Sequence, residues 1–195
     1  DIEGAEVLIF PGVGAFGPAV RRLKTMGEWE ALKGYLADTE RPFLGICIGM
    51  QVLFEGSEES PGTDGLAIFC GRVEKFQTKD PVPHIGWNLV AGSQEQGIDI
   101  IPTGRYYYVH SYCVPAKEIH EDNTQRMYTE YGGVRYLAAI QRGRQCAVQF
   151  HPEKSAEMGL QLLDNFLMNR ISRPSVSSRT SQEQGLALRI VAALD

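Results

Sequence analysis

Cys47 has the clearest capacity for covalent chemistry in this sequence. It lies in the pattern Gly-x-Cys-x-Gly, between Gly45 and Gly49, after one apolar run and before another. A strand that turns sharply into a helix at its nucleophile needs small residues on both sides, and the helix N-terminus favours a thiolate. We therefore interpret Cys47 as a nucleophile whose sulfur is exposed at the edge of a sheet. The alternative is an inert cysteine buried in the core.

His151 is the candidate base, because a thiol nucleophile needs an imidazole that takes its proton and returns it to the leaving group. Pro152 and Glu153 follow directly. Glu153 can accept a hydrogen bond from the imidazole and fix its tautomer. The alternative is a His-Pro turn, with Glu153 complementing the dipole at a helix N-terminus. Together these residues favour a Cys-His-Glu triad, with His151 within a helix diameter, about 10 Å, of Cys47.

Residues 11–17 form a glycine-rich segment directly after an apolar run at residues 5–10. A tetrahedral oxyanion needs two backbone N–H donors. Ile48, the residue after the nucleophile, is expected to supply one of them, and this glycine-rich segment the other. Its spacing fits neither common phosphate-binding pattern. An ordinary strand-to-helix turn is the alternative.

The other histidines are weaker candidates. His84 and His110 lie in aromatic, strand-like segments, where a structural role is the favoured interpretation, and His120 lies among polar residues typical of a solvated surface. None of the three has a cysteine or acidic partner at the spacing of metal ligands. The sequence therefore predicts neither a metal site nor a cofactor.

The elements that must position these residues alternate between strand and helix, which indicates an α/β fold with parallel strands. Predicted strands cover residues 5–10, 43–46, 71–76, 85–90, 106–109, 134–141 and 145–150. Predicted helices cover residues 18–26, 28–39, 48–55 and 155–171. The apolar stripe of the last helix is expected to pack against the sheet; it consists of Leu160, Leu163, Phe166, Leu167 and Ile171.

The composition of the 195 residues, 43% of them hydrophobic, suits one domain with a sizeable core. A net charge of −5 without a basic run argues against nucleic-acid binding. Every apolar run is far shorter than the roughly 20 residues of a membrane span. The four cysteines are far apart, which favours reduced thiols inside the cell. We expect a cytoplasmic protein, with a plastid as the alternative for a plant chain.

The composition changes near the C-terminal end of the chain. Residues 172–182 are polar, rich in serine and without periodicity, as linkers are. The last residues are apolar again and resemble the beginning of a strand. We predict a catalytic domain at residues 1–171, a linker at residues 172–185 and the start of a second domain at residues 186–195.

These motifs together resemble those of class I glutamine amidotransferases, in which Cys, His and Glu hydrolyse the side-chain amide of glutamine. The resemblance extends over about residues 5–167. Two segments narrow it to the glutaminase part of imidazole glycerol phosphate synthases: residues 11–16 and 83–88. Residues 188–195 resemble the first barrel strand of the cyclase in these enzymes, with Asp195 at the place of a catalytic aspartate. The resemblance implies a bifunctional chain of the type found in fungi and plants.

The family has a flavodoxin-like fold, in which helices flank a mixed central sheet. Its members begin with a strand, a helix and a second strand before the run that matches residues 5–10. Those N-terminal strands are missing here, so we expect a sheet edge and its apolar surface to be left uncovered.

The resemblance also implies roles for individual residues. Those of the triad are Cys47, His151 and Glu153, and those of the oxyanion hole are Val13 and Ile48. Glutamine would be held by Gly12, Gln51, Ser111 and Tyr112, and the surface that meets the cyclase would contain His84, Trp87 and Asn88. Ammonia from glutamine would pass to the (β/α)8 cyclase, which forms imidazole glycerol phosphate and aminoimidazole carboxamide ribotide in histidine biosynthesis.

Three other functions remain as alternatives. Another triad-type amidotransferase or a DJ-1-like cysteine hydrolase has the same turn around its cysteine. A truncated fragment that only docks to a partner, without catalysis, is the third.

Overall fold

The computed structural model describes residues 2–90, 98–118, 124–171 and 188–190. Its main sheet has the strand order β10-β1-β2-β9-β8-β7. The parallel strands are β1 (Val7–Gly12), β2 (Phe43–Cys47), β9 (Gln145–Val148) and β10 (Leu188–Ile190). The two strands that pair in antiparallel fashion are β8 (Val134–Arg142) and β7 (Gln125–Tyr131). The sheet is therefore mixed.

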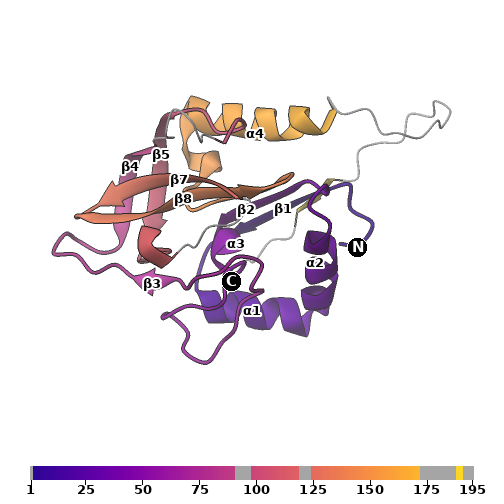
Figure 1. Ribbon diagram of the computed structural model, residues 1–195, viewed down its shortest axis with the longest axis horizontal. Helices are drawn as coiled ribbons and strands as arrows, with labels where there is room; N and C mark the ends of the chain where they lie inside the picture. The colour runs from indigo at the N-terminus through magenta and orange to yellow at the C-terminus, as the bar shows by residue number, and fades with distance from the viewer. Residues whose placement is uncertain (1, 91–97, 119–123, 172–187, 191–195) are drawn as a thin grey trace.

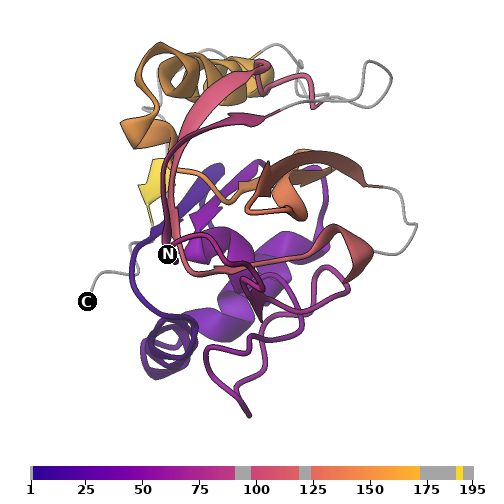
Figure 2. The same ribbon diagram turned by 90° about the vertical axis from the view of Figure 1, so that its left-hand side faces the viewer.

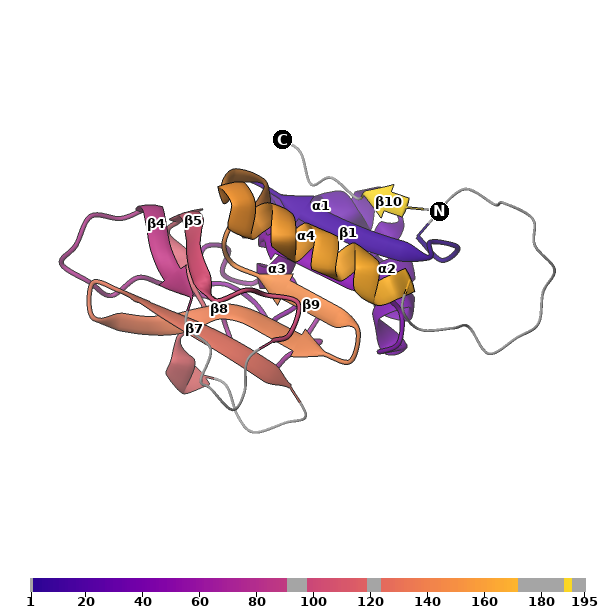
Figure 3. The ribbon, with the colours of Figure 1, turned by 90° about the horizontal axis from the view of Figure 1, so that it is seen from above.

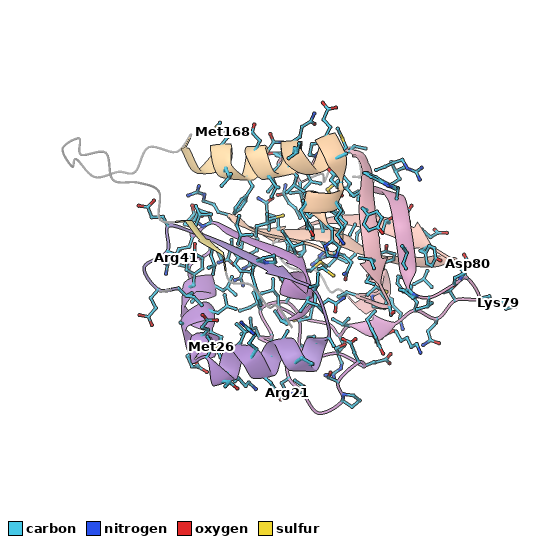
Figure 4. The ribbon with its side chains drawn as sticks, turned by 180° about the vertical axis from the view of Figure 1, so that it is seen from behind. Arg21, Met26, Arg41, Lys79, Asp80 and Met168 are labelled. Atoms are coloured by element: carbon cyan, nitrogen blue, oxygen red, sulfur yellow. The ribbon has the colours of Figure 1, made fainter. Side chains whose placement is uncertain are left out.

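Helices cover both faces of this sheet (Figures 1 and 3). On one face lie α1 (Phe16–Thr25), α2 (Glu28–Ala37) and the short α3 (Ile48–Gln51), and on the other α4 (Ala156–Ile171). Successive strand residues point to opposite faces, so Leu8 packs with the α1 and α2 side while Val7 packs with α4. Figure 4 shows the same layers: Met26 lies on the α1 side and Met168 on α4.

A two-stranded ribbon of β4 (His84–Val90) and β5 (Gly104–His110) stands beside the main sheet, and Figure 2 turns it towards the reader. Its buried face carries Tyr106 and Tyr108, which pack against Phe150. The remaining elements are short: the strand pair β3 (Glu74–Lys75) and β6 (Tyr112–Cys113), and the helical turns η1 (Ala116–Glu118) and η2 (Pro152–Lys154).

The structure confirms the predicted α/β fold with a mixed sheet between helices. The hairpin predicted near residues 142–144 is also confirmed, as β8 and β9. The stripe predicted on α4 is wrong in part, because Leu160 is 66% exposed and Leu162 is fully buried in its place. Phe166 is buried as predicted.

Two predicted elements are shorter than expected. The helix predicted for residues 48–55 ends after Gln51. Leu53 N and Phe54 N donate to carbonyls only three residues back, and Glu55 N donates to the carbonyl of Gly71 instead of that of Gln51. The strand predicted for residues 71–76 is reduced to β3. In both places the backbone hydrogen bonds join two loops, residues 55–58 and residues 71–73, to each other.

The edge of β1 is not open where we expected it to be. Leu188–Ile190 pair with Val7, Leu8 and Ile9 in parallel and cover this part of the edge as β10. The whole of the predicted linker and the rest of the predicted second domain lie outside the described residues. The division of the chain into three segments therefore stays a prediction.

Candidate active site

Cys47 stands at the turn between β2 and α3. It is the last residue of β2, and its backbone φ of 53° lies in the left-handed region that a non-glycine residue rarely adopts. Strain of this kind costs on the order of 1–3 kcal/mol and persists where the surrounding structure imposes it. Because β1 is a parallel neighbour of β2, Gly12 at the end of β1 lies opposite Cys47. The nucleophile thus sits where neighbouring strands end.

The two glycines of the turn are needed because the chain passes very close to itself. A Cβ added to Gly45 would lie 2.7 Å from the carbonyl oxygen of Gly49. A Cβ added to Gly49 would overlap the carbonyl oxygen of Phe10 in β1. The small residues expected around the nucleophile therefore let α3 pack directly against β1 and β2.

We expect the substitution Gly49→Ala to lower the free energy of unfolding by about 2–3 kcal/mol, since the added methyl meets backbone that cannot move aside. Urea unfolding of the purified chain measures this loss. The matched control is Gly34→Ala in α2, where an added Cβ meets nothing within 4 Å. This control should raise the stability by about 0.5–1 kcal/mol. A Gly49→Ala protein as stable as the wild type would contradict the close approach.

A cavity of about 410 Å³ opens at Cys47. Its lining brings together residues that are far apart in the sequence: Val13, Gly14, Cys47, Ile48, Gln51, Glu59, Pro83, Val109, His110, Ser111, Tyr112, His151 and Lys154. The expectation of an exposed sulfur is wrong, because Cys47 as a whole is only 6% exposed. It is nevertheless not an inert core cysteine, since it borders this cavity beside His151.

His151 is held between Glu153 and Cys47. Its Nδ1 lies 2.6 Å from Glu153 Oε1, so Nε2 is the ring nitrogen left for Cys47. Burial disfavours the charged imidazole, but the hydrogen bonds and negative charges of Cys47 and Glu153 outweigh burial and raise the pKa of His151 to about 9. Burial likewise opposes the charge of Glu153, yet the hydrogen bond with His151 and its charge lower the pKa of this carboxyl. The pKa shifts of His151 and Glu153 thus favour an imidazolium paired with a carboxylate.

The backbone of His151 is fixed by the ribbon and by the start of α4. Its N–H donates to the carbonyl of Tyr107 at 2.9 Å, and its carbonyl accepts from the Ser155 hydroxyl at 2.6 Å. Ser155 Oγ in turn accepts from the N–H of Tyr107 at 2.9 Å. Since Tyr107 belongs to β5, the ribbon sets the position of the imidazole.

Most of the other predicted site residues reach the cavity. Val13, Ile48, Gln51, Ser111 and Tyr112 line it, and Val13 is 46% exposed. Gly12 is the exception among the residues predicted to hold glutamine. It is buried at the end of β1, where an added Cβ would lie 3.0 Å from Ile48 Cβ.

The three residues predicted for the cyclase interface differ in exposure. The prediction that His84 lies at the interface is wrong. Its side chain is 3% exposed and stacks between Tyr108 and Tyr131, so it is a structural histidine rather than part of the surface. Burial lowers its pKa to about 4. Trp87 is 45% exposed, whereas Asn88 is half-buried and donates to the carbonyl of Glu130.

Sequence reasoning assigned no role to several groups at the cavity. Glu59 and Lys154 border it, and no local pattern distinguishes them from solvated surface charges. Gln149 lies in the same motif as His151, and its Nε2 is 3.6 Å from the sulfur of Cys47. His110 also borders the cavity; its Nδ1 donates to the Tyr112 carbonyl, and burial lowers its pKa to about 3.

The described part of the chain contains no group of three or more His, Cys, Asp or Glu side chains that could hold a metal ion. In the same residues, no helix combines the length and the apolar character needed to cross a membrane.

Comparisons with known proteins give the family of this chain. The family model described as "Glutamine amidotransferase class-I" matches residues 1–170. The chain is 41% identical over its whole length to "Imidazole glycerol phosphate synthase hisHF" of Schizosaccharomyces pombe, and covers 38% of that protein. It is 46% identical to "Imidazole glycerol phosphate synthase subunit HisH" of Thermococcus kodakarensis, over 85% of this chain and 84% of that one.

A solved structure titled as a glutamine amidotransferase has the same fold, with a TM-score of 0.62 at 15% identity over 84% of this chain and 80% of that one. The chain spans less than two fifths of the length of its hisHF relatives.

Proposed function

The chain belongs to the class I glutamine amidotransferase family, and from this premise we propose that it hydrolyses the side-chain amide of glutamine and passes the ammonia to a cyclase. One observation carries the proposal: Cys47 and His151 meet at a cavity, and Glu153 holds the imidazole at 2.6 Å. The names of the relatives narrow the function to the synthesis of imidazole glycerol phosphate.

In the first step the Cys47 thiolate attacks the amide carbon of glutamine. A carbon–sulfur bond forms, and the electron pair of the carbonyl moves to its oxygen. The backbone N–H groups of Ile48 and Val13 stabilise this oxyanion; Ile48 is the first residue of α3, where N–H groups have no partner within the helix. The carbon–nitrogen bond then breaks as His151 gives its proton to the nitrogen, which leaves as ammonia. A thioester on Cys47 remains.

In the second step His151 acts as a base. Once the sulfur is acylated, it no longer carries the negative charge that helps to raise the pKa of His151. The imidazole, which has given its proton to the departing ammonia, is neutral and can take a proton from water, which attacks the thioester, breaks the carbon–sulfur bond and releases glutamate. The same charge that makes His151 an acid in the first step is absent in the second, so one residue serves both.

The substrate is held by groups on the cavity wall. Gln51 Nε2 is bonded within the protein, whereas Gln51 Oε1 has no hydrogen-bond partner among the described residues. This oxygen can accept a hydrogen bond from the substrate. The carboxylate of Glu59 suits the ammonium group of an amino acid. Ser111 and Tyr112 complete the wall on the side of β6.

The cyclase would meet the outer face of β4. Alternate residues of this strand, Ile85, Trp87 and Leu89, are between 45% and 59% exposed and form an apolar stripe. Exposed apolar stripes of this kind mark surfaces that meet a partner. Pro83, just before β4, lines the catalytic cavity, so ammonia that leaves on this side would reach the partner before the solvent. The cyclase would be the second domain of the same native chain, beyond the linker predicted at residues 172–185, in the cytoplasm or a plastid.

Labelling with a diazo-ketone analogue of glutamine tests the proposed function. We expect mass spectrometry to find one covalent adduct, on Cys47, and free glutamine to compete with its formation. An assay with glutamine, peptide and glyoxal substrates separates a glutaminase from a DJ-1-like hydrolase. Absence of the adduct in a folded chain, together with no turnover of peptide or glyoxal substrates, would leave only the docking fragment.

The substitution Glu153→Gln should shift the pH dependence of kcat/KM for glutamine. The pKa of His151, about 9, predicts that activity falls as the pH rises through this value, because a neutral imidazole cannot protonate the departing ammonia. Removing the carboxylate lowers this pKa, so the alkaline limb should move down by on the order of one pH unit.

The titration of glutamine itself is the same for both proteins, so the difference between their profiles reports on the enzyme. Coincident alkaline limbs would contradict the proposed role of Glu153.

A further inference from the structure

We propose that Gln149 is a positioning residue whose side-chain amide keeps the Cys47 sulfur ionised by donating a hydrogen bond to it. The inference rests on the proposed function, because it concerns the nucleophile of that reaction. Gln149 is fully buried, with 0% of its surface exposed, and its Nε2 lies 3.6 Å from Cys47 Sγ. Gln149 lies two residues before His151, and its contact with the sulfur is separate from that of the His151 imidazole.

The orientation of the Gln149 amide is fixed by a relay that begins at a backbone carbonyl. The carbonyl oxygen of Tyr112 can only accept a hydrogen bond, so Gln51 must turn its Nε2 towards it, at 3.0 Å. The same Nε2 donates to Gln149 Oε1, also at 3.0 Å. With its oxygen held by Gln51, Gln149 presents its N–H group to the sulfur.

A reversed Gln149 amide would be unfavourable at two points. Its oxygen would face the sulfur, and its nitrogen would face Gln51 Nε2, donor against donor. Reversing Gln51 as well would bring its oxygen against the Tyr112 carbonyl. Because Gln51 is 2% exposed and Gln149 is fully buried, little water is available to replace the lost hydrogen bonds. The backbone of β6 thus decides, through two side chains, that the sulfur receives a donor.

A donor at this place favours the thiolate over the thiol. A hydrogen bond to the charged form of a group stabilises that form, and the effect is larger where little water competes. His151 supplies one proton to the sulfur, but that proton leaves with ammonia during the reaction. The N–H of Gln149 stays in place throughout, so it supports the thiolate before the attack and again when the thioester is hydrolysed.

Alkylation of Cys47 by iodoacetamide as a function of pH tests this role in the full chain, since only the thiolate reacts at a useful rate. In Gln149→Met, which has similar length and no donor, we expect the midpoint of the profile to move to higher pH by about one unit, a tenfold loss of rate below the midpoint. Gln149→Glu keeps the shape but brings acceptors to the sulfur, and should move the midpoint further in the same direction.

Two controls belong to the same experiment. Cys70 is an exposed cysteine of the same chain, so its profile in the same samples should stay unchanged. Gln51→Met leaves Gln149 in place but removes the group that orients it, and should move the Cys47 midpoint upward by less than Gln149→Met. The other titratable groups of the cavity are the same in every variant: Glu59, His110, Tyr112, His151 and Lys154.

A Cys47 profile in folded Gln149→Met that coincides with the wild type would overturn the inference, because a residue that only fills space would leave the profile in place. If Gln149→Met does not fold, an unshifted profile in Gln51→Met has the same meaning. Glutamine hydrolysis is measured separately. A shifted profile in a chain that does not hydrolyse glutamine would sustain this inference and refute the proposed function.

Discussion

Cys47→Ala should abolish the hydrolysis of glutamine, with a fall in kcat on the order of 10⁴- to 10⁶-fold. The alanine cannot form the thioester, and His151 then lacks the group that it serves. The remaining cavity can still orient glutamine, so we expect binding to persist. Ammonia release in a coupled assay measures the loss, and calorimetry with glutamine measures the binding. The methyl group fits where the sulfur was, so the fold should be unchanged.

The matched control is Cys70→Ala, which removes an exposed cysteine that does not line the cavity. It should hydrolyse glutamine at the rate of the wild type. If Cys47→Ala kept a substantial part of the activity, the nucleophile would have to be another group, and the proposed function would lose its basis.

Val13→Pro should lower the turnover of glutamine by about 10²- to 10³-fold. This is the usual loss when one oxyanion donor is removed, and it corresponds to about 2.7–4 kcal/mol of transition-state stabilisation. Proline has no N–H, so the oxyanion would keep only the donor from Ile48. Val13 is exposed at the cavity, and a new ring there meets solvent rather than the core. Alkylation of Cys47 by iodoacetamide forms no oxyanion and should proceed at nearly the rate of the wild type.

Val13→Ala keeps the N–H and changes only the exposed side chain, so it should retain most of the turnover. This control separates the backbone donor from the side chain. Full glutaminase activity in Val13→Pro would show that the second donor lies elsewhere in the glycine-rich segment or outside it.

The residues around the nucleophile could be recognised in the sequence because their constraints are local. Gly45 and Gly49 lie two positions from Cys47, and the turn needs both because a Cβ at either would meet backbone. The spacing of His151 and Glu153 is equally short, and one proline between them is enough to place a carboxylate at Nδ1. The alternating order of strand-like and helical segments likewise sufficed for the α/β fold.

The environment of these residues could not be predicted from local patterns. Cys47 was expected to be exposed and His84 to lie on a surface, yet both are buried. Gln149 lies against the sulfur of Cys47, and His84 stacks between Tyr108 and Tyr131. The helix predicted beyond Gln51 ends early for the same kind of reason, since the N–H of Glu55 donates to the carbonyl of Gly71 in a later loop. Glu59 reaches the cavity from a loop whose sequence resembles ordinary surface.

The sequence by itself determined which groups can react, because short local patterns identify the nucleophile with its turn and the base with its carboxylate. Only the tertiary structure decided what surrounds them. The parallel order of β1, β2 and β9 brings residues 12, 47 and 151 together at one end of the sheet. It also places Gln51 and Gln149 where a carbonyl of β6 fixes both amides. Hydrogen-bond direction and burial depend on contacts across the whole chain, and no local spacing specifies them.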